Sequence, residues 1–332
     1  AIYWIGAVLI NDAQDMQEKF TLFSDMVVFS SYAMQVVMSF MMLVMIFIML
    51  PRASVAAKRI LEVLDTEPSI EDGTRDTFPV MKDGEVEFKD VSFKYPDAEE
   101  YVLEHISFSA KKGETIAFIG GTGCGKSTAI NLIPRFYDAT EGEVFVDGVN
   151  VKEYTQEALH NKIGYVSQKA ILFSGTIADN VAYGENGKAP ATQDDIAMAV
   201  KVAQASEFVE KKDQGYDGYV AQGGSNFSGG QKQRLSIARA IARQPEILIF
   251  DDSFSALDYK TDRILREALR KECKDATKII VAQRIGTIRD ADKIIVLDDG
   301  QIAGMGTHDE LMKNCEVYQE IAYSQLSKEE LA

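Results

Sequence analysis

The chain has 332 residues, of which 46% are apolar and 26% are charged, and its formal net charge is −16 at pH 7. This composition is that of a globular protein with enough length for a sizeable core, and it excludes wholesale disorder. The acidic balance argues against a nucleic-acid-binding protein, because such a protein would carry a basic face.

The three cysteines are Cys124, Cys273 and Cys315, and their spacing fits neither a metal site nor a disulfide framework. Free thiols of this kind suit a reducing cytosol.

The chain opens inside an apolar stretch, AIYWIGAVLI, rather than at a methionine. No basic residue precedes this stretch, so a signal peptide fits poorly. Residues 1–10 resemble the trailing end of a membrane helix, and we expect the chain to be a fragment of a longer polypeptide.

Met26–Leu50 contains no charged residue over 25 positions. A helix of this length extends about 37 Å, which exceeds a hydrocarbon core of about 30 Å. The alternative is a buried core helix, but such helices are usually shorter. We therefore predict a transmembrane helix over about residues 24–50.

Charges flank this segment unequally. Basic residues follow it (Arg52, Lys58 and Arg59), and acidic residues precede it (Asp12, Asp15, Glu18 and Asp25). The positive side faces the cytoplasm. This predicts that everything after residue 50 lies on the cytoplasmic side.

Residues 51–66 are rich in helix formers and predict a cytosolic extension of the membrane helix, kinked at Pro51. Residues 67–83 are polar with Pro and Gly, so we expect a linker. The membrane part is therefore residues 1–66, the next domain is residues 84–323, and residues 324–332 form a tail.

From Glu85 the pattern changes to that of an α/β domain. VEFKDVSFKY alternates apolar and polar residues, as a half-buried antiparallel strand does. ETIAFIG, ILIF and KIIVA are short apolar runs of the kind buried in a parallel sheet. Helices are predicted at Lys126–Tyr137, Asp194–Lys212 and Ser228–Arg243. These elements predict a parallel α/β core, an antiparallel β portion and a helical insert between Gln168 and Ser228.

A glycine-rich loop lies between a predicted strand and a predicted helix, in the pattern G-x-x-x-x-G-K-[ST]. Its backbone N–H groups and the helix N-terminus are suited to phosphates. Lys126 is expected to reach the β- and γ-phosphates of a nucleotide, and Ser127 to ligate Mg²⁺. The predicted ATP-binding residues here are Gly120, Gly121, Thr122, Gly123, Cys124, Gly125, Lys126, Ser127 and Thr128.

Two further segments suit the same chemistry. Asp251 ends the apolar strand Ile247–Phe250, at the edge where α/β sheets bind ligands, and is expected to support Mg²⁺. Ser228, Gly229, Gly230 and Gln231 precede or open a good helix and present N–H groups to an anion. In isolation, the first would be an Asp that merely ends a strand, and the second a flexible helix cap.

Together, GGTGCGKST, SQ (Ser167–Gln168), FSGGQ (Phe227–Gln231), ILIFDDSFSALD and VAQR (Val281–Arg284) resemble the nucleotide-binding domain of an ATP-binding cassette (ABC) transporter of the exporter type. The resemblance is dense over about residues 84–323 and covers the membrane stretch only in layout. It implies the P-loop ABC cassette fold, an ATPase activity that drives transport, and ATP with Mg²⁺ as cofactors. It also implies a protein of the cytoplasmic membrane that is multi-pass at full length.

The resemblance also implies roles for single residues. Tyr95 would stack on adenine; the alternative is ordinary strand packing. Gln168 would reach Mg²⁺ or the attacking water. The signature Ser228–Gln231 would complete the ATP site of a partner in a head-to-tail dimer, and Ser255–Asp258 would line the seam.

Three positions depart from the family pattern. Asp252 stands where most members carry a catalytic Glu, and Gln283 stands where they carry a His. Asp is one methylene shorter, and misplacing a general base by about 1 Å can cost about 100-fold in rate. Gln283 donates a hydrogen bond but carries no charge near neutrality. Gln222 replaces the usual Glu of the X-loop.

These departures resemble the degenerate-site subunit of heterodimeric multidrug exporters. The expected partner is a second half-transporter with Glu and His in the catalytic positions and an altered signature. The expected cargo is drug-like or lipid-like, and Met34, Met38, Met41, Met42 and Met45 could contact it, although such residues more often face lipid. A homodimeric exporter with slow hydrolysis, and a regulatory ATP-binding subunit without transport, are the alternatives.

Overall fold

The computed structural model describes residues 1–76 and 83–325. The chain divides into two compact units, Ala1–Ser69 and Ile70–Ala332. The expected tail at 324–332 lies mostly outside the described residues, as does the 77–82 part of the expected linker.

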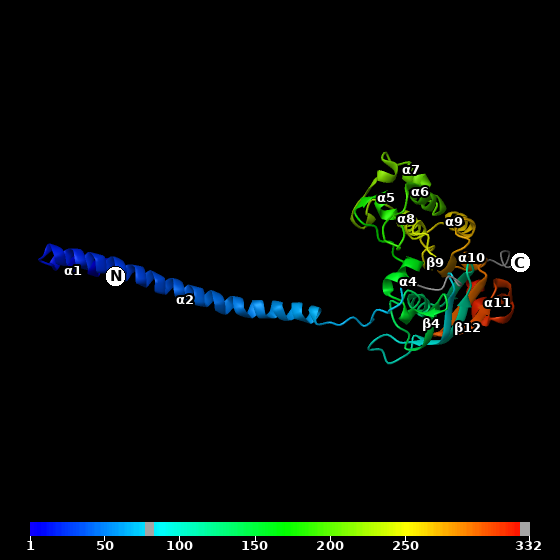
Figure 1. Cartoon of the computed structure of the whole chain (residues 1–332), viewed down its shortest axis with the longest axis horizontal. Coiled ribbons are helices and arrows are strands. Elements are labelled where there is room, and N and C mark those ends of the chain that lie inside the picture. Colours follow the sequence, from blue (N-terminus) through cyan, green and yellow to red (C-terminus); the bar gives the residue numbers. More distant parts are fainter. Residues whose placement is uncertain (77–82, 326–332) are drawn as a thin grey trace. The chain divides into compact units, whose positions relative to one another are not determined.

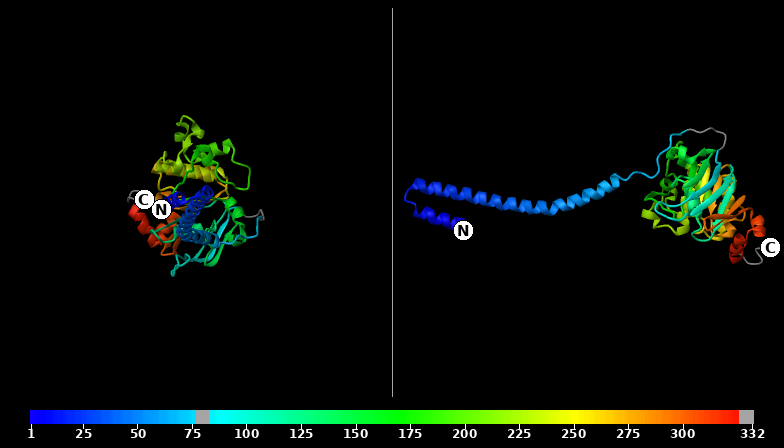
Figure 2. Two further views of the ribbon diagram at one scale, coloured as in Figure 1. Left: turned by 90° about the vertical axis from the view of Figure 1, so that its left-hand side faces the viewer. Right: turned by 90° about the horizontal axis from the view of Figure 1, so that it is seen from below.

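The first unit is a helical hairpin. Helix α1 (Ile2–Asp12) turns back along the start of helix α2 (Met16–Leu64), as Figure 2 shows. The hydroxyls of Tyr3 and Ser30 lie 2.9 Å apart across the pair. No residue of either helix is buried, and most of their apolar side chains are exposed.

Helix α2 is longer than the expected segment at 24–50 and begins at Met16, just after Asp15 in an extended conformation. QEKFTLFSD before the apolar run contains no Gly or Pro, so nothing in it stops a helix. Pro51 lies inside α2, which continues through it to Leu64. Within the described residues, α2 is the helix long and apolar enough to cross a membrane.

The second unit begins with a four-stranded antiparallel sheet in the order β2-β1-β4-β5. Its strands are β1 (Val86–Phe93), β2 (Leu103–Ala110), β4 (Glu141–Val146) and β5 (Val149–Asn150). Strand β1 buries Val86 and Phe88 in the expected alternation, which a register shift between Phe88 and Val91 then interrupts. The predicted antiparallel portion is confirmed.

A six-stranded sheet in the order β12-β11-β3-β10-β9-β6 forms the centre of the unit. Every neighbouring pair is parallel except β11 with β12. The strands are β3 (Thr115–Gly120), β6 (Ile163–Val166), β9 (Ile247–Asp251), β10 (Thr277–Val281), β11 (Lys293–Asp298) and β12 (Gln301–Gly306). Strands β9 and β10 are buried throughout, because helices or the other sheet cover both faces.

Helices α5, α6, α7 and α8 gather at one end of this unit (Figure 1). They are α5 (Ile177–Val181), α6 (Gln193–Val202), α7 (Ser206–Glu210) and α8 (Gly229–Ala242), with the small pair β7 (Gly175–Thr176) and β8 (Tyr219–Val220) beside them. The single helix predicted at Asp194–Lys212 is wrong. Gln204 adopts a left-handed φ of 56° between α6 and α7, and a continuous helix cannot include that conformation.

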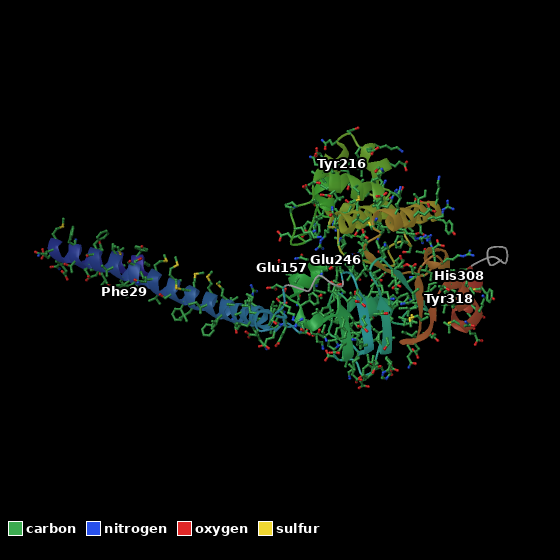
Figure 3. All side chains as sticks on the ribbon, turned by 45° about the vertical axis from the view of Figure 1, so that its right-hand side comes forward. Phe29, Glu157, Tyr216, Glu246, His308 and Tyr318 are labelled. Atoms are coloured by element: carbon green, nitrogen blue, oxygen red, sulfur yellow. The ribbon has the colours of Figure 1, made fainter. Side chains whose placement is uncertain are left out.

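The other helices complete the unit: α3 (Lys126–Asn131), α4 (Gln156–Lys162), α9 (Tyr259–Glu272), α10 (Ile285–Ile288), α11 (His308–Asn314) and α12 (Glu316–Gln325). The last two pack through His308 and Tyr318, whose Nδ1 and hydroxyl lie 2.7 Å apart; Figure 3 shows these side chains together. The predicted fold class, an α/β cassette with an antiparallel portion, a helical portion and a long apolar helix, is confirmed.

Candidate nucleotide site

The glycine-rich loop joins the end of β3 to the start of α3. Gly125 precedes α3 with a φ of 93°, and a Cβ there would lie 2.9 Å from the carbonyl of Val102. Only glycine fits such a position without strain. At Gly121 and Gly123, by contrast, a Cβ would meet nothing within 4 Å, so this side of the loop is open. Thr122 between them is exposed, and Cys124 is buried beneath the loop.

The ammonium group of Lys126 is held by the loop's own carbonyls. Its Nζ donates to Gly120 at 2.9 Å and to Gly121 at 2.6 Å, with the Cys124 thiol at 3.5 Å. A positive charge therefore lies on the loop whose N–H groups are suited to an anion.

Helix α3 is shorter than the predicted Lys126–Tyr137. It ends at Asn131, and the chain continues in turns with i to i+3 hydrogen bonds from Ile133 and Arg135. Pro134 has no N–H to continue an α-helix and restricts the residue before it, which accounts for the early end.

Ser127 and Asp251 meet beside the loop. The Ser127 hydroxyl donates to Asp251 Oδ1 at 2.7 Å, and Asp251 is the last residue of β9 and is buried. An aliphatic hydroxyl and a carboxylate are oxygen donors of the kind that Mg²⁺ prefers, so the pair fits this ion.

The second oxygen of Asp251 has a partner that the sequence did not identify. Tyr165 on β6 places its hydroxyl 2.9 Å from Asn131 Oδ1 and 3.4 Å from Asp251 Oδ2. The sequence did contain one indication that Asn131 lies near the site: it follows Ser127 by four residues and so shares its helix face.

Asp252 joins the two glutamines of the predicted catalytic set. Its Oδ2 accepts from Gln283 Nε2 at 2.9 Å and from Gln168 Nε2 at 3.3 Å. The three residues follow β9, β10 and β6, which are neighbours in the sheet. Burial, the largest influence, raises the pKa of Asp252 above its usual value, and the hydrogen bond from Gln168 partly offsets it.

Tyr95 lies just after β1 and is both packed and connected to the loop. Its ring meets Phe93 and Tyr137 edge to face, at 5.0 Å and 5.2 Å between centroids. Its hydroxyl lies 3.0 Å from Thr128 Oγ1, at the start of α3. The ring of Tyr95 therefore packs against neighbouring aromatic side chains, and its hydroxyl reaches the phosphate loop.

The signature residues form the start of α8. Ser228 and Gln231 make a reciprocal capping box: the Gln231 N–H donates to Ser228 Oγ at 3.3 Å, and the Ser228 N–H donates to Gln231 Oε1 at 3.0 Å. Gly229 is open, and Gly230 approaches the Ala256 carbonyl. Across residues 1–76 and 83–325, no hydrogen bond joins Ser228–Gln231 to the phosphate loop.

Residues 103–255 match the family described as ABC transporter. An uncharacterized ABC transporter ATP-binding protein of Mycobacterium tuberculosis is 45% identical over 326 residues, which are 98% of this chain and 55% of the relative. An ATP-dependent lipid A-core flippase of Haemophilus influenzae is 42% identical over 276 residues, or 83% of this chain and 46% of the relative. A putative multidrug export ATP-binding/permease protein of Staphylococcus aureus is 44% identical over 262 residues, or 79% and 45%.

Among solved structures, a bacterial Atm1-family ABC exporter with ATP bound is similar, with a TM-score of 0.78 and 33% identity. The match covers 92% of this chain and 53% of that one. The chain thus spans about half the length of these relatives. The cassette fold, the motifs on its sheet edge and these similarities together show that the chain carries the nucleotide-binding domain of an ABC transporter of the exporter type.

Proposed function

We propose that this chain is the ATP-binding part of one half of a membrane exporter, and that its own ATP site binds nucleotide but hydrolyses it poorly. One observation carries the proposal: the carboxylate after the metal-binding Asp251 belongs to an aspartate, and two neutral amides hold the same oxygen of it.

The residues present fit MgATP. The phosphates would replace the Gly120 and Gly121 carbonyls as partners of Lys126, which currently donates to both. Ser127 and Asp251 would hold Mg²⁺, which neutralises charge on the phosphates when bound. Tyr95 would stack on adenine, since it lies next to Thr128 of the same loop.

Asp252 is in the position of a general base, but its reach is short. A base must approach the attacking water to hydrogen-bond distance, and a shortfall of about 1 Å costs about 100-fold in rate. Gln168 and Gln283 further restrain the carboxylate at Oδ2. Gln283 cannot supply the positive charge that a His could place near the γ-phosphate.

The signature explains why the chain would need a partner. Ser228, Gly229 and Gly230 open α8 and form no hydrogen bond to this chain's own phosphate loop within the described residues. In a head-to-tail dimer they would complete the ATP site of a second half-transporter that carries Glu and His. The degenerate site would then combine Lys126 and Asp251 with an altered signature from that partner.

Helix α2 and the relatives support the proposed membrane placement and cargo. No residue of α2 is buried, and the helix is long enough to span the cytoplasmic membrane, which would place the cassette in the cytoplasm. Relatives described as a lipid A-core flippase and as a multidrug export protein favour a hydrophobic or amphipathic substrate. The exposed methionines Met34, Met38, Met41, Met42 and Met45 offer a pliable apolar surface for it.

The raised pKa of Asp252 favours a second candidate, a homodimeric exporter with slow hydrolysis at this site. A carboxylate whose pKa is raised by burial accepts a proton more readily, which partly compensates for its short reach.

An ATPase assay separates the two candidates. The chain is expressed at full length alone and with its candidate partner, and the partner's Glu→Gln and this chain's Asp252→Ala are compared. We expect the partner's change to abolish turnover, and Asp252→Ala to leave most of it. Loss of turnover with Asp252→Ala, together with a harmless partner change, would rule out the degenerate site.

Restoring the usual residues gives a complementary test. The double variant Asp252→Glu, Gln283→His should raise ATP turnover at this site about 10-fold or more, because it supplies both the missing reach and an imidazole. Gln222→Glu, another departure from the family pattern away from the carboxylate network, is the matched control and should not do so. An unchanged rate in the double variant would show that these two positions do not limit hydrolysis.

A further inference from the structure

We propose that Tyr165 is a positioning residue that orients Asp251 for its magnesium ion, an inference that rests on the proposed function. Tyr165 lies on β6, next to β9, whose last residue is Asp251. Its hydroxyl lies 3.4 Å from Asp251 Oδ2, while Ser127 donates to Asp251 Oδ1 at 2.7 Å. The carboxylate is therefore contacted at both oxygens, from two different elements.

The Tyr165 hydroxyl has one proton and two acceptors. The shorter contact is to Asn131 Oδ1, at 2.9 Å. An ionised carboxylate is a stronger acceptor than a neutral amide, so Asp251 competes for this proton. Asn131 in turn lies one helical turn after Ser127, and α3 thus supplies both the partner of Oδ1 and the acceptor that competes for the Tyr165 proton.

The tyrosine itself is well fixed. Its ring is half-buried and packs edge to face with Phe136, at 5.4 Å between centroids. The hydroxyl is therefore held beside Asp251 by a packed ring on β6.

A fixed donor on Oδ2 limits rotation of the Asp251 carboxylate and leaves Oδ1 directed at Ser127, the side on which the ion would bind. Partners that orient a metal ligand in this way typically contribute 10- to 100-fold to metal affinity. Tyr165 would contact neither nucleotide nor ion, so its removal should weaken metal binding and leave nucleotide binding without metal intact.

The test uses Mn²⁺ as a probe for Mg²⁺. The full 332-residue chain, wild type and Tyr165→Phe, is titrated with Mn²⁺ in the presence of ATP, and free Mn²⁺ is followed by electron paramagnetic resonance. We expect Tyr165→Phe to weaken Mn²⁺ binding about 10-fold or more, with unchanged ATP affinity in EDTA. Tyr154→Phe, which removes a buried hydroxyl that donates to the Val146 carbonyl at 2.9 Å, is the control and should change neither.

A second variant distinguishes positioning from a general loss of structure. Asn131→Ala removes the competing acceptor and leaves the hydroxyl to Asp251 alone, so Mn²⁺ affinity should be equal or higher. Weaker Mn²⁺ binding in Asn131→Ala, or unchanged binding in Tyr165→Phe, would overturn the inference. If the wild-type chain bound no ATP even without metal, the proposed function would fall as well; normal wild-type binding with an indifferent Tyr165→Phe would overturn this inference alone.

Discussion

At Asp252, burial and hydrogen bonding act on the same carboxylate in opposite directions. Burial raises its pKa and is the larger influence, while the hydrogen bonds from Gln168 and Ser255 lower it. The residue also has a left-handed φ of 45°, which Asp tolerates better than most residues. A Glu at this position gains reach but carries a small conformational cost, so Asp252→Glu should slightly reduce stability.

The pKa of Asp252 predicts how its replacement changes stability with pH. A folded-state pKa above the usual 3.8 means that the folded protein holds this proton more tightly than the unfolded chain does. The resulting stabilisation is complete below pH 3.8 and is lost as the pH rises through the folded-state pKa. Asp252→Asn avoids this loss, so its gain in thermal stability should be larger at pH 8 than at pH 4.5.

Thermal unfolding of both proteins at the two pH values checks this expectation, with Asp258→Asn as the control. Asp258 is exposed, and its pKa is lowered by its hydrogen bonds to Thr261. Its replacement should therefore reduce stability at pH 8. An equal gain for Asp252→Asn at both pH values would contradict the assignment.

Most of the predicted site residues came from the resemblance to the ABC family. Asp252, Gln168 and Gln283 are separated by up to 115 positions, yet they meet because they follow neighbouring parallel strands. Tyr165 was not predicted as a site residue, because in the sequence a tyrosine inside a short apolar strand looks the same as a tyrosine that packs in the core. Its role depends on which side chain the adjacent strand places beside it.

At the scale of elements, the expected linker is partly ordered against the cassette. Gly73 N–H donates to the Tyr154 carbonyl at 3.0 Å, the Thr74 and Arg75 N–H groups donate to the Glu153 carbonyl, and Thr155 N–H returns a bond to Arg75. The side chain of Asp72 also accepts from the N–H of Gln156 at 2.6 Å. The polar composition predicted a linker, and composition alone cannot predict these backbone hydrogen bonds.

Gly73 is required by the closeness of this pairing. A Cβ at Gly73 would collide with the backbone carbonyls of Glu153 and Tyr154. Gly73→Val should therefore release the segment, and trypsin should cleave after Arg75 several-fold faster in limited proteolysis, because cleavage requires local opening. Thr74→Val, which places the same valine side chain one residue later, is the control, and trypsin should digest this variant at the wild-type rate.

Helix ends were the least predictable feature of the elements. Helix α8 (Gly229–Ala242) lies within one residue of the predicted Ser228–Arg243 at each end, and Ser228 caps it together with Gln231. In contrast, α3 ends at Asn131, and α6 ends at Val202. The helical spacing in both segments continues past these ends, so periodicity alone overestimated their length.

At the scale of the whole molecule, the charges around α2 predict its orientation. Arg52, Lys58 and Arg59 follow the apolar run and belong on the cytoplasmic side. In a variant without native cysteines, Ser54→Cys should react with a membrane-impermeant maleimide only in inverted vesicles, and Gln14→Cys only in intact spheroplasts. The reverse pattern would place the cassette on the wrong side for cytoplasmic ATP.

The amino-acid sequence determined the fold class, the order of motifs and the order of membrane and cassette segments, because these depend on local patterns: apolar runs, glycine positions and charge. The tertiary structure decided which side chains share a hydrogen bond. Asp252 with two amides, Tyr165 with Asp251, and Gly73 with Tyr154 are pairs far apart in the chain. Such pairs depend on strand register and close backbone approach, which local sequence does not encode.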